Sequence, residues 1–456
     1  MRFTKPVLRS VRRGRDFPVF RATTEASLVA LGFALLGHTS YGAGLIVLVG
    51  LAAVTPPRPG ARARRDWSIP LVAVVALVLK TITWGRFRIH LMGRLPQGPV
   101  IIVANHAHDA DSMVLPVTLA LARGLRHPLI SSGSARLFEP GFLAERMPPA
   151  IGQWLASVNL SSILWAIGVR PIEDAPLSHS LKSWAYLIYQ TWGDQPLLSV
   201  FRDDAIPHQA QAKTLRYLWS RRGWAWAHER HTLRVLKDPY REWVRLHTRD
   251  VVETQMAVLR DAADRGLAIY TTPEGRLTTD GRLTRFRASW SLLIDHYQGT
   301  VVAAATSYDL MRRGRLHLWT VLTPLTDLTA VEGSVARLRP ITASHLLAHA
   351  WFSTTHRTAD RLISLALDAY HHLPAEAVVA ANLRRNPLRL LKQRGHWLIK
   401  KAAQGLPIQD KRFPHVPDLL AYYANQFTEI LSAWEVHRQQ AQADARREAR
   451  QSSDGA

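Results

Sequence analysis

The chain has 456 residues, of which 47% are hydrophobic and 20% are charged, so it is long enough for more than one domain and is neither disordered nor collagen-like. It contains no cysteine, which excludes disulfide bonds, a thiolate nucleophile and metal sites held by cysteine. Lys and Arg number 58 against 35 Asp and Glu, a formal net charge of +23. This excess indicates a polyanionic neighbour such as nucleic acid, an anionic lipid surface or a phosphorylated substrate.

The first region, residues 1–85, combines basic clusters with apolar stretches. Residues 26–54 are apolar and have arginines on both sides, but they are too few for two helices of the roughly 20 residues that cross a bilayer. A single crossing would separate the two basic flanks, although Lys and Arg tend to stay on the cytoplasmic side. We therefore expect a shallow hydrophobic helical hairpin that enters and leaves the membrane on one side. The alternative is a buried hairpin of a soluble domain.

A second short apolar stretch, residues 69–84, contains Lys80. It is predicted to be a helix that lies at the membrane interface or packs on the main domain.

The central region, residues 86–325, alternates between strand-like and helix-like segments. Residues 99–105 form a β-branched run typical of a buried strand, and strand patterns return at 266–272 and 300–308, each after a helical pattern. This alternation predicts an α/β fold with a layered sheet and flanking helices. A polar helical insertion is expected at about 175–245.

The insertion is rich in tryptophan and arginine. This combination suits an anionic membrane interface, and it suits the packing of a helical subdomain equally well. Residues 326–456 carry helical patterns only and are predicted to form a C-terminal helical extension. Within it, residues 388–401 are expected either to bind a membrane surface or to pack their apolar side on the core.

The most informative stretch, Asn105-His106-Ala107-His108-Asp109-Ala110-Asp111, follows a predicted strand directly. If the loop turns into a helix, the Asp111 carboxylate can reach one nitrogen of His106. The other nitrogen is then free to act as a base and to take a proton from a substrate hydroxyl. The spacing alone is common, so a polar helix cap with surface histidines is an alternative.

The same stretch raises the question of a metal site. His106, His108, Asp109 and Asp111 resemble a ligand cluster of a metal-dependent hydrolase. The order of the residues departs from the His-x-His-x-Asp-His pattern of such zinc loops, so no metal is expected.

The second informative stretch, Thr271-Thr272-Pro273-Glu274-Gly275-Arg276, also follows a predicted strand. Glycine allows a ligand to approach the backbone closely, the acid can bond a hydroxyl, and Arg276 can bind a phosphate. Arg282 follows six residues after Arg276. The alternative is a solvated basic turn.

Together the two stretches resemble the glycerolipid acyltransferases, typified by lysophosphatidate acyltransferase. The run GRLPQGPVIIVANHAHDAD is similar to the family's strand followed by Asn-His-x-x-x-x-Asp, and VLRDAADRGLAIYTTPEG is similar to the lead-in to its Pro-Glu-Gly-Thr-Arg block. The resemblance covers roughly residues 86–310, and the two stretches occur in the family's order and each after a strand.

The resemblance implies an enzyme that moves a fatty acyl group from acyl-CoA or acyl-ACP to a hydroxyl of a glycerol phosphate or lysophospholipid, in phospholipid biosynthesis. His106 would be the base and Asp111 its orienting partner, while Glu274 and Gly275 would help to hold the acceptor. No metal or organic cofactor is implied, and the acyl thioester is a co-substrate, with acyl carrier protein as one donor. The catalytic domain would lie on the cytoplasmic side of an anionic membrane. His108 is assigned no catalytic role.

Several departures from the family affect the expected phosphate site. Arg276 stands where the family has threonine, and the second block carries Arg170 early and Asp174 in place of the usual arginine. We therefore expect Arg170, Arg276 and Arg282 to bind the acceptor, whose head group can differ from the family's. An acyltransferase with another lipid acceptor stays open as an alternative. A nucleic-acid-binding module is not expected, because no such motif is present and the N-terminal region is apolar.

Overall fold

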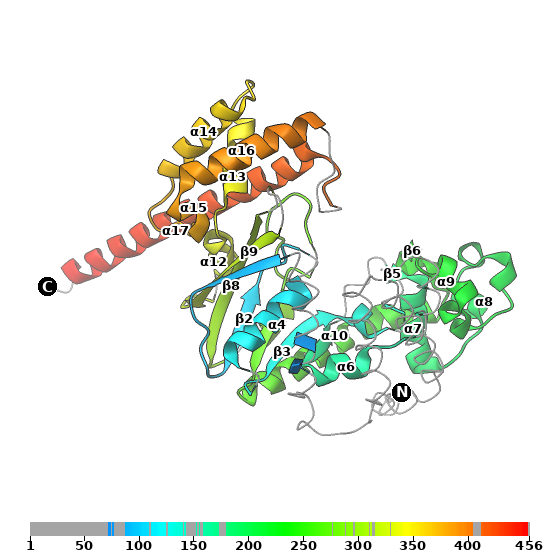
Figure 1. Cartoon of the computed structure of the whole chain (residues 1–456). Helices are drawn as coiled ribbons and strands as arrows, with labels where there is room; N and C mark the ends of the chain where they lie inside the picture. Colours follow the sequence, from blue (N-terminus) through cyan, green and yellow to red (C-terminus); the bar gives the residue numbers. More distant parts are fainter. Residues whose placement is uncertain are drawn as a thin grey trace. The chain divides into compact units, whose positions relative to one another are not determined.

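The computed structural model describes most of the chain beyond residue 86. It describes residues 72, 73, 75, 76, 87–108, 111–124, 126–139, 141, 142, 152, 155, 158–172, 179–275, 277–287, 289–294, 297–309, 311, 315–328, 330–404 and 412–454. The predicted hairpin at 26–54, Asp109 and Arg276 lie outside these residues. The chain divides into two compact units (Figure 1), one of residues 1–82 and 124–265 and the other of residues 83–123 and 266–456.

The second unit contains a mostly parallel sheet. Its strands are ordered β1-β9-β8-β2-β7. Strand β2 lies parallel to both β7 and β8, and β1 lies parallel to β9, whereas β8 and β9 are antiparallel. The bounds are β1 (Phe87–Met92), β2 (Val100–Ala104), β7 (Ala268–Thr271), β8 (Thr300–Asp309) and β9 (Leu316–Leu325).

Strand β2 is central, and every one of its residues is buried. This explains its sequence, because a strand between two parallel neighbours has both faces covered and reads as a continuous β-branched run. The helix α4 (Asp111–Arg123) follows β2. At its end, the Arg123 guanidinium donates to the carbonyl oxygens of Pro96, Gln97 and Gly98, which ties the helix to the turn before β2.

The C-terminal helices of this unit pack on one another and on the sheet (Figure 1). One hydrophobic cluster joins Leu318 and Trp319 of β9 to Leu346 of α13 and Phe427 of α17. The helix α12 packs on β8, β9 and α17. Besides α4, the described helices of this unit are α11 (Ser289–Ile294), α12 (Val331–Leu338), α13 (Ala343–Phe352), α14 (Ala359–His371), α15 (Ala381–Arg385), α16 (Pro387–Gln404) and α17 (Val416–Asp454).

Buried polar groups fix this packing. Asp309, the last residue of β8, accepts hydrogen bonds from Ser344 Oγ at 2.6 Å and from Arg394 Nη2 at 3.3 Å. His345 lies 2.7 Å from Gln426 Oε1 through its Nε2, and burial lowers the pKa of His345 to about 3. The imidazole is therefore neutral, and His345 and Asp309 both have hydrogen-bond partners, as is usual for buried polar groups.

The first unit contains the parallel pair β3 (Leu129–Ser134) and β4 (Val169–Ile172), and the short antiparallel pair β5 (His179–Ser180) and β6 (Arg230–His231). Its helices are α6 (Ser161–Ala166), α7 (Leu181–Trp192), α8 (Leu197–Val200), α9 (Arg221–Ala227) and α10 (Tyr240–Asp264). Short 3-10 helices are η3 (Ala135–Phe138), η5 (Asp203–Ala205), η6 (His208–Ala210), η7 (Leu215–Trp219) and η8 (Leu233–Val235).

The tryptophan-rich insertion has a hydrophobic cluster of its own. Trp184 and Trp219 are buried in it, and Trp192, Trp226 and Trp243 pack against it. These side chains therefore pack a helical subdomain, one of the two alternatives that the sequence left open.

The observed architecture is mixed α/β, with a mostly parallel sheet flanked by helices, as the sequence predicts at this level. The strands predicted at 99–105, 266–272 and 300–308 and the helices predicted beyond residue 340 are confirmed. None of the helices in the described part of the chain is long and apolar enough to cross a lipid bilayer.

Candidate active site

The two informative stretches meet at one edge of the sheet. Strands β2 and β7 are parallel neighbours, with Ile101 opposite Ile269 and Val103 opposite Thr271. Their carboxyl ends therefore lie at the same edge, where ligands commonly bind in open α/β sheets. The loop with His106 leaves the sheet here, beside the loop with Glu274.

Asn105 fixes the start of the first loop. Its side-chain Nδ2 donates to the Thr306 carbonyl oxygen at 3.0 Å, and its Oδ1 accepts the Thr306 backbone N–H at 2.6 Å. This double hydrogen bond holds the end of β2 against β8. These two bonds fix the position of the backbone directly before His106.

Asp111 opens α4 and organises the same loop. It is fully buried, and its Oδ2 accepts the backbone N–H groups of Ala107 at 2.7 Å and His108 at 2.8 Å. Its Oδ1 accepts the hydroxyl of Tyr308 from β8. A carboxylate at the first turn of a helix is favourable, and these three donors compensate its burial.

Tyr308 remains a donor in this arrangement. Burial and then the neighbouring Asp111 charge raise the pKa of Tyr308 well above its ordinary value. The phenol is therefore protonated and can donate to Asp111. The sequence does not indicate this role of Tyr308, because a tyrosine inside an apolar strand carries no local signal of it.

His106 lies beside Asp111 without a hydrogen bond to it. The distance from His106 Nδ1 to Asp111 Oδ2 is 3.7 Å, which is longer than a hydrogen bond. His106 Nδ1 is buried and has no hydrogen-bond partner among the described residues. The structure thus places the two predicted residues together, but the expected hydrogen bond is absent. Hydrogen bonds of catalytic bases are often long in ligand-free enzymes and shorten on substrate binding.

Glu274 ties the two loops together. Its Oε1 accepts the His106 backbone N–H at 2.6 Å, and its Oε2 accepts the Thr284 backbone N–H at 2.8 Å. Burial raises the pKa of Glu274 to about 7, against the opposing effects of these two bonds and of the Arg339 and His106 charges. Its carboxylate thus holds the backbone of His106, which spacing in the sequence did not indicate. A contact with the acceptor stays a prediction.

Gly275 occupies a turn that requires glycine. Its φ is +66°, and a Cβ at this position would lie 2.2 Å from Arg287 Cζ. The Arg287 guanidinium donates to the Gly275 carbonyl oxygen at 3.2 Å. Glycine therefore lets this arginine lie against the loop.

A small hollow lies next to His106. Its volume is about 10 Å³, about enough for one water molecule. The predicted Arg282 and the unpredicted Arg339 both line it. The full lining is Asn105, His106, Ala107, Glu274, Thr278, Gly281, Arg282, Leu283, Arg339, Tyr422 and Gln426.

Helix α17 forms one wall of this hollow. Gly281 has a φ of +83°, and a Cβ there would lie 2.0 Å from the Tyr422 carbonyl oxygen of α17. The buried Arg339 donates to the Gly281 carbonyl oxygen at 3.2 Å and pairs with Glu429 of α17. The C-terminal extension therefore belongs to the surroundings of His106, a role that its helical periodicity alone did not indicate.

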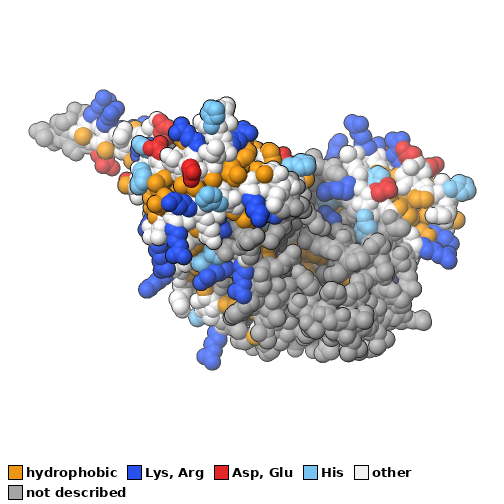
Figure 2. Space-filling model, turned by 45° about the horizontal axis from the view of Figure 1, so that its top comes forward, with side chains coloured by type: hydrophobic (Ala, Val, Ile, Leu, Met, Phe, Trp, Pro, Cys, Tyr) orange, Lys and Arg blue, Asp and Glu red, His pale blue; other side chains and the backbone are white. Residues whose placement is uncertain are grey.

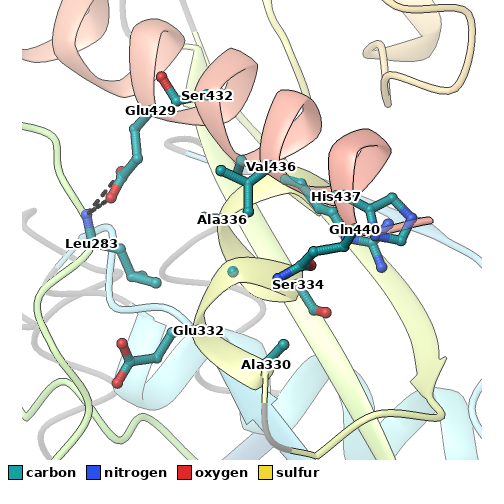
Figure 3. Close-up of a pocket in the computed structure, with 13 residues that line it drawn as sticks. Leu283, Ala330, Glu332, Ser334, Ala336, Glu429, Ser432, Val436, His437 and Gln440 are labelled. Atoms are coloured by element: carbon teal, nitrogen blue, oxygen red, sulfur yellow. Dashed lines mark hydrogen bonds between the residues drawn. The ribbon is translucent and has the colours of Figure 1, made fainter. Parts of the chain in front are cut away.

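A larger cleft of about 410 Å³ lies between α12 and α17 (Figure 3). Leu283 lines both the cleft and the hollow. Its backbone N–H donates to the carboxylate of Glu429 at 2.9 and 3.0 Å, as the dashed lines in Figure 3 show. Small side chains, among them Ala336, form much of the wall. The volume lies within the range of small-molecule sites.

The structure does not place the other two predicted arginines, Arg170 and Arg276, at this site. Arg170 belongs to the first unit, where its Nη1 donates to the carbonyl oxygens of Trp165 and Val169 at 3.0 Å and its guanidinium lies 4.3 Å from the Trp165 ring centre. Arg276 lies outside the described residues. Their expected roles stay predictions.

Among the described residues, no three His, Asp or Glu side chains lie together as a metal site would require. His108 instead has aromatic neighbours, with its ring 4.9 Å from that of Tyr308 and 5.7 Å from that of Phe87. Asp109, the fourth member of the alternative ligand cluster, lies outside the described part of the chain.

No model of a known protein family matches the chain, and no curated protein sequence matches it.

Proposed function

We propose that this protein is a membrane-associated acyltransferase, which moves a fatty acyl group from an acyl thioester to a hydroxyl of a glycerol phosphate or lysophospholipid. One observation carries the proposal: residues 168 positions apart in the chain are joined at one sheet edge, where Glu274 bonds the backbone of His106. His106 in turn lies 3.7 Å from a buried carboxylate. A base, an adjacent acid and a loop that fixes the base are what proton transfer from an alcohol needs.

In the proposed reaction, an imidazole nitrogen of His106 takes the proton of the acceptor hydroxyl. The alcohol oxygen attacks the thioester carbon, a new ester C–O bond forms, and the C–S bond breaks. The departing thiolate takes a proton, so that ester and thiol are the products and the imidazole is neutral again. Asp111 stabilises the imidazolium that exists between these proton transfers.

The acceptor's phosphate is proposed to bind arginines near the Gly281 turn. Arg282 is exposed and lines the hollow beside His106, and a guanidinium binds phosphate through paired N–H donors. Arg276 and Arg170 are further proposed phosphate ligands. Arg339 is a weaker candidate, because its donors already bond Gly281 and Glu429.

Substrate binding requires the site to open. The hollow beside His106 has room for about one water molecule, whereas an acyl chain and an acceptor need several hundred cubic ångströms. Tyr422 and Gln426 of α17 line this hollow, so we propose that α17 and the Gly281 loop move apart to admit the substrates. The cleft at Leu283 is the adjacent space into which the hollow can extend.

The finer features of the proposal come from the resemblance to glycerolipid acyltransferases. They are that family's layered fold, a catalytic domain on the cytoplasmic side, acyl-CoA or acyl carrier protein as donor, and no cofactor. The N-terminal hairpin is proposed as an anchor because residues 26–54 are apolar and have basic flanks. A role in phospholipid biosynthesis belongs to the same proposal.

A substrate panel tests the proposed function. Purified protein is mixed with glycerol phosphate and several lysophospholipids, and with a labelled acyl donor on CoA or on acyl carrier protein. The expected result is one acceptor whose mass increases by one acyl group. Release of free fatty acid with no acylated product for any acceptor would contradict the proposal.

A further inference from the structure

Helix α16 uses one face for packing. Leu391, Gly395 and Leu398 are buried, and Arg394 is buried with its partner Asp309. At Gly395 the contact with α14 is so close that a Cβ would lie 2.8 Å from Ile363 Cγ1. The apolar side of this helix therefore packs on the core, as one of the two alternatives for residues 388–401 has it.

The opposite face of α16 carries a stripe of exposed basic side chains, and Arg385, the last residue of α15, adds another two positions before α16 begins. The members within α16 are three or four positions apart, so they lie along one side of that helix. The stripe is formed by Arg385, Arg389, Lys392, His396 and Lys400, all exposed. No Asp or Glu occurs in residues 377–404, and within the described residues no acid pairs with any of the five.

Two apolar groups lie near this cationic stripe. Leu388 is 43% exposed, although it is a large hydrophobic residue. Trp397 is partly exposed, and Lys401 Nζ lies 5.9 Å from the centre of its ring. Figure 2 shows Lys, Arg and His side chains, with hydrophobic ones between them, over the part of the molecule formed by the C-terminal helices.

The surrounding charges do not neutralise the stripe. Helix α14, which packs beside α16, exposes Asp360 and Asp368 together with Arg361, His371 and His372. Asp368 lies 3.5 Å from His372 Nδ1 on its own helix. The exposed end of α17, in contrast, mixes both signs, as in the pair of Arg447 with Asp444 at 3.8 Å. A surface that only keeps a protein soluble typically mixes charges of both signs, as this end of α17 does.

We propose that this face of α16 docks on an anionic lipid bilayer. A one-sided row of cations on an amphipathic helix is attracted to acidic head groups, and exposed Leu and Trp side chains suit the interface. Because the apolar stripe of α16 is already buried in the core, the helix lies on the surface and does not insert. The contact is therefore electrostatic and weakens with salt. This inference deepens the proposed function, and rests on it for the choice of a membrane as partner.

The absence of native cysteine allows a local test on the full chain. A fluorophore is attached to Gln393→Cys on α16 and, as the matched control, to Gln442→Cys on the exposed end of α17. Vesicles contain phosphatidylglycerol and a lipid with a nitroxide head group. We expect quenching at position 393 to be at least about twofold stronger than at 442 at low salt, and to fall at high salt. A local quencher reports on α16 even if residues 1–85 also bind the vesicle.

Charge reversal adds a second variant. Changing Arg385, Arg389 and Lys392 to Glu should remove the quenching at position 393, whereas the same change at Arg438, Arg446 and Arg447 of α17 should leave it intact. Equal quenching at 393 and 442, no quenching at 393, or a stronger response of the 393 label to duplex DNA than to vesicles would each overturn the proposal. Acyl transfer to a detergent-dispersed acceptor is measured in parallel. Transfer without quenching would reject only the docking surface, and quenching without transfer would reject only the activity.

Discussion

At the scale of single residues, Asp111 has more than one task. Its oxygens accept two backbone N–H groups and the Tyr308 hydroxyl, while His106 Nδ1 lies 3.7 Å away. These donors compensate the buried carboxylate for the loss of its hydration. The same donors hold the loop, so the geometry of the site depends on interactions that involve no substrate.

Tyr308→Phe tests this arrangement. The variant removes one donor from a buried carboxylate, and we expect a loss of about 1–3 kcal/mol in the free energy of unfolding. Denaturant unfolding measures the loss, and Tyr370→Phe, a partly exposed tyrosine of α14, serves as the control. Equal stability of the Tyr308 variant and the wild type would show that the hydroxyl does not stabilise Asp111.

Glu274 gives a prediction for pH. Because burial raises its pKa from 4.5 to about 7, the folded protein binds a proton that the unfolded chain has already lost. The contribution of Glu274 to the free energy of unfolding is therefore fully present below pH 4.5 and is lost as the pH rises through 7. The unfolding free energy of Glu274→Gln, relative to wild type, should increase over that interval. Exposed Glu376, changed to Gln, is the control; a relative stability of the Glu274 variant that stays constant or falls would contradict the assignment.

At the scale of elements, α17 is joined to the loop after β7 by specific polar contacts. Glu429 accepts the Leu283 backbone N–H and pairs with Arg339, and Asn425 Nδ2 donates to the Asp280 carbonyl oxygen at 3.0 Å. These contacts connect residues about 90 to 146 positions apart. An element of the C-terminal extension therefore shapes the surroundings of His106.

Glu429→Gln should destabilise the protein. Arg339 has only 2% of its side chain exposed, and removing its partner leaves a buried charge uncompensated, at a cost of about 3 kcal/mol. The exposed pair of Asp444 and Arg447 is the matched control, and Asp444→Asn should change stability by about 0.5 kcal/mol or less. Thermal unfolding of both variants checks this, and a similar small effect in both would mean that the Arg339 pair contributes little.

At the scale of the whole molecule, local signals predicted much of the fold. The β-branched run of β2 and the turn that precedes it are visible in the sequence, because burial on both faces and glycine turns impose local patterns. The meeting of His106 with Glu274 was expected only through the two strands that precede them. The hydrogen bond between Tyr308 and Asp111 and the pairing of Arg339 with Glu429 were not expected, because contacts between distant segments leave no local pattern in the sequence.

Anchoring is also a property of the whole molecule. If α16 contributes to membrane binding, deletion of residues 1–66 should leave binding to anionic vesicles that disappears between about 0.1 and 0.5 M salt. Binding of the full chain should resist the same salt if the predicted hairpin inserts. Vesicle sedimentation at both salt concentrations checks this. If the variant without residues 1–66 does not bind the vesicles even at low salt, α16 does not contribute to membrane binding.

The central claim is that His106 is the base of an acyl transfer. The most direct test compares the rate of acyl transfer from a labelled thioester by wild type, by His106→Ala and by the control His356→Ala, an exposed histidine of the same unit. The account predicts a rate about 10²–10⁴-fold lower for the His106 variant, with unchanged unfolding, and a wild-type rate for the control. Transfer by folded His106→Ala at a rate close to wild type would contradict it.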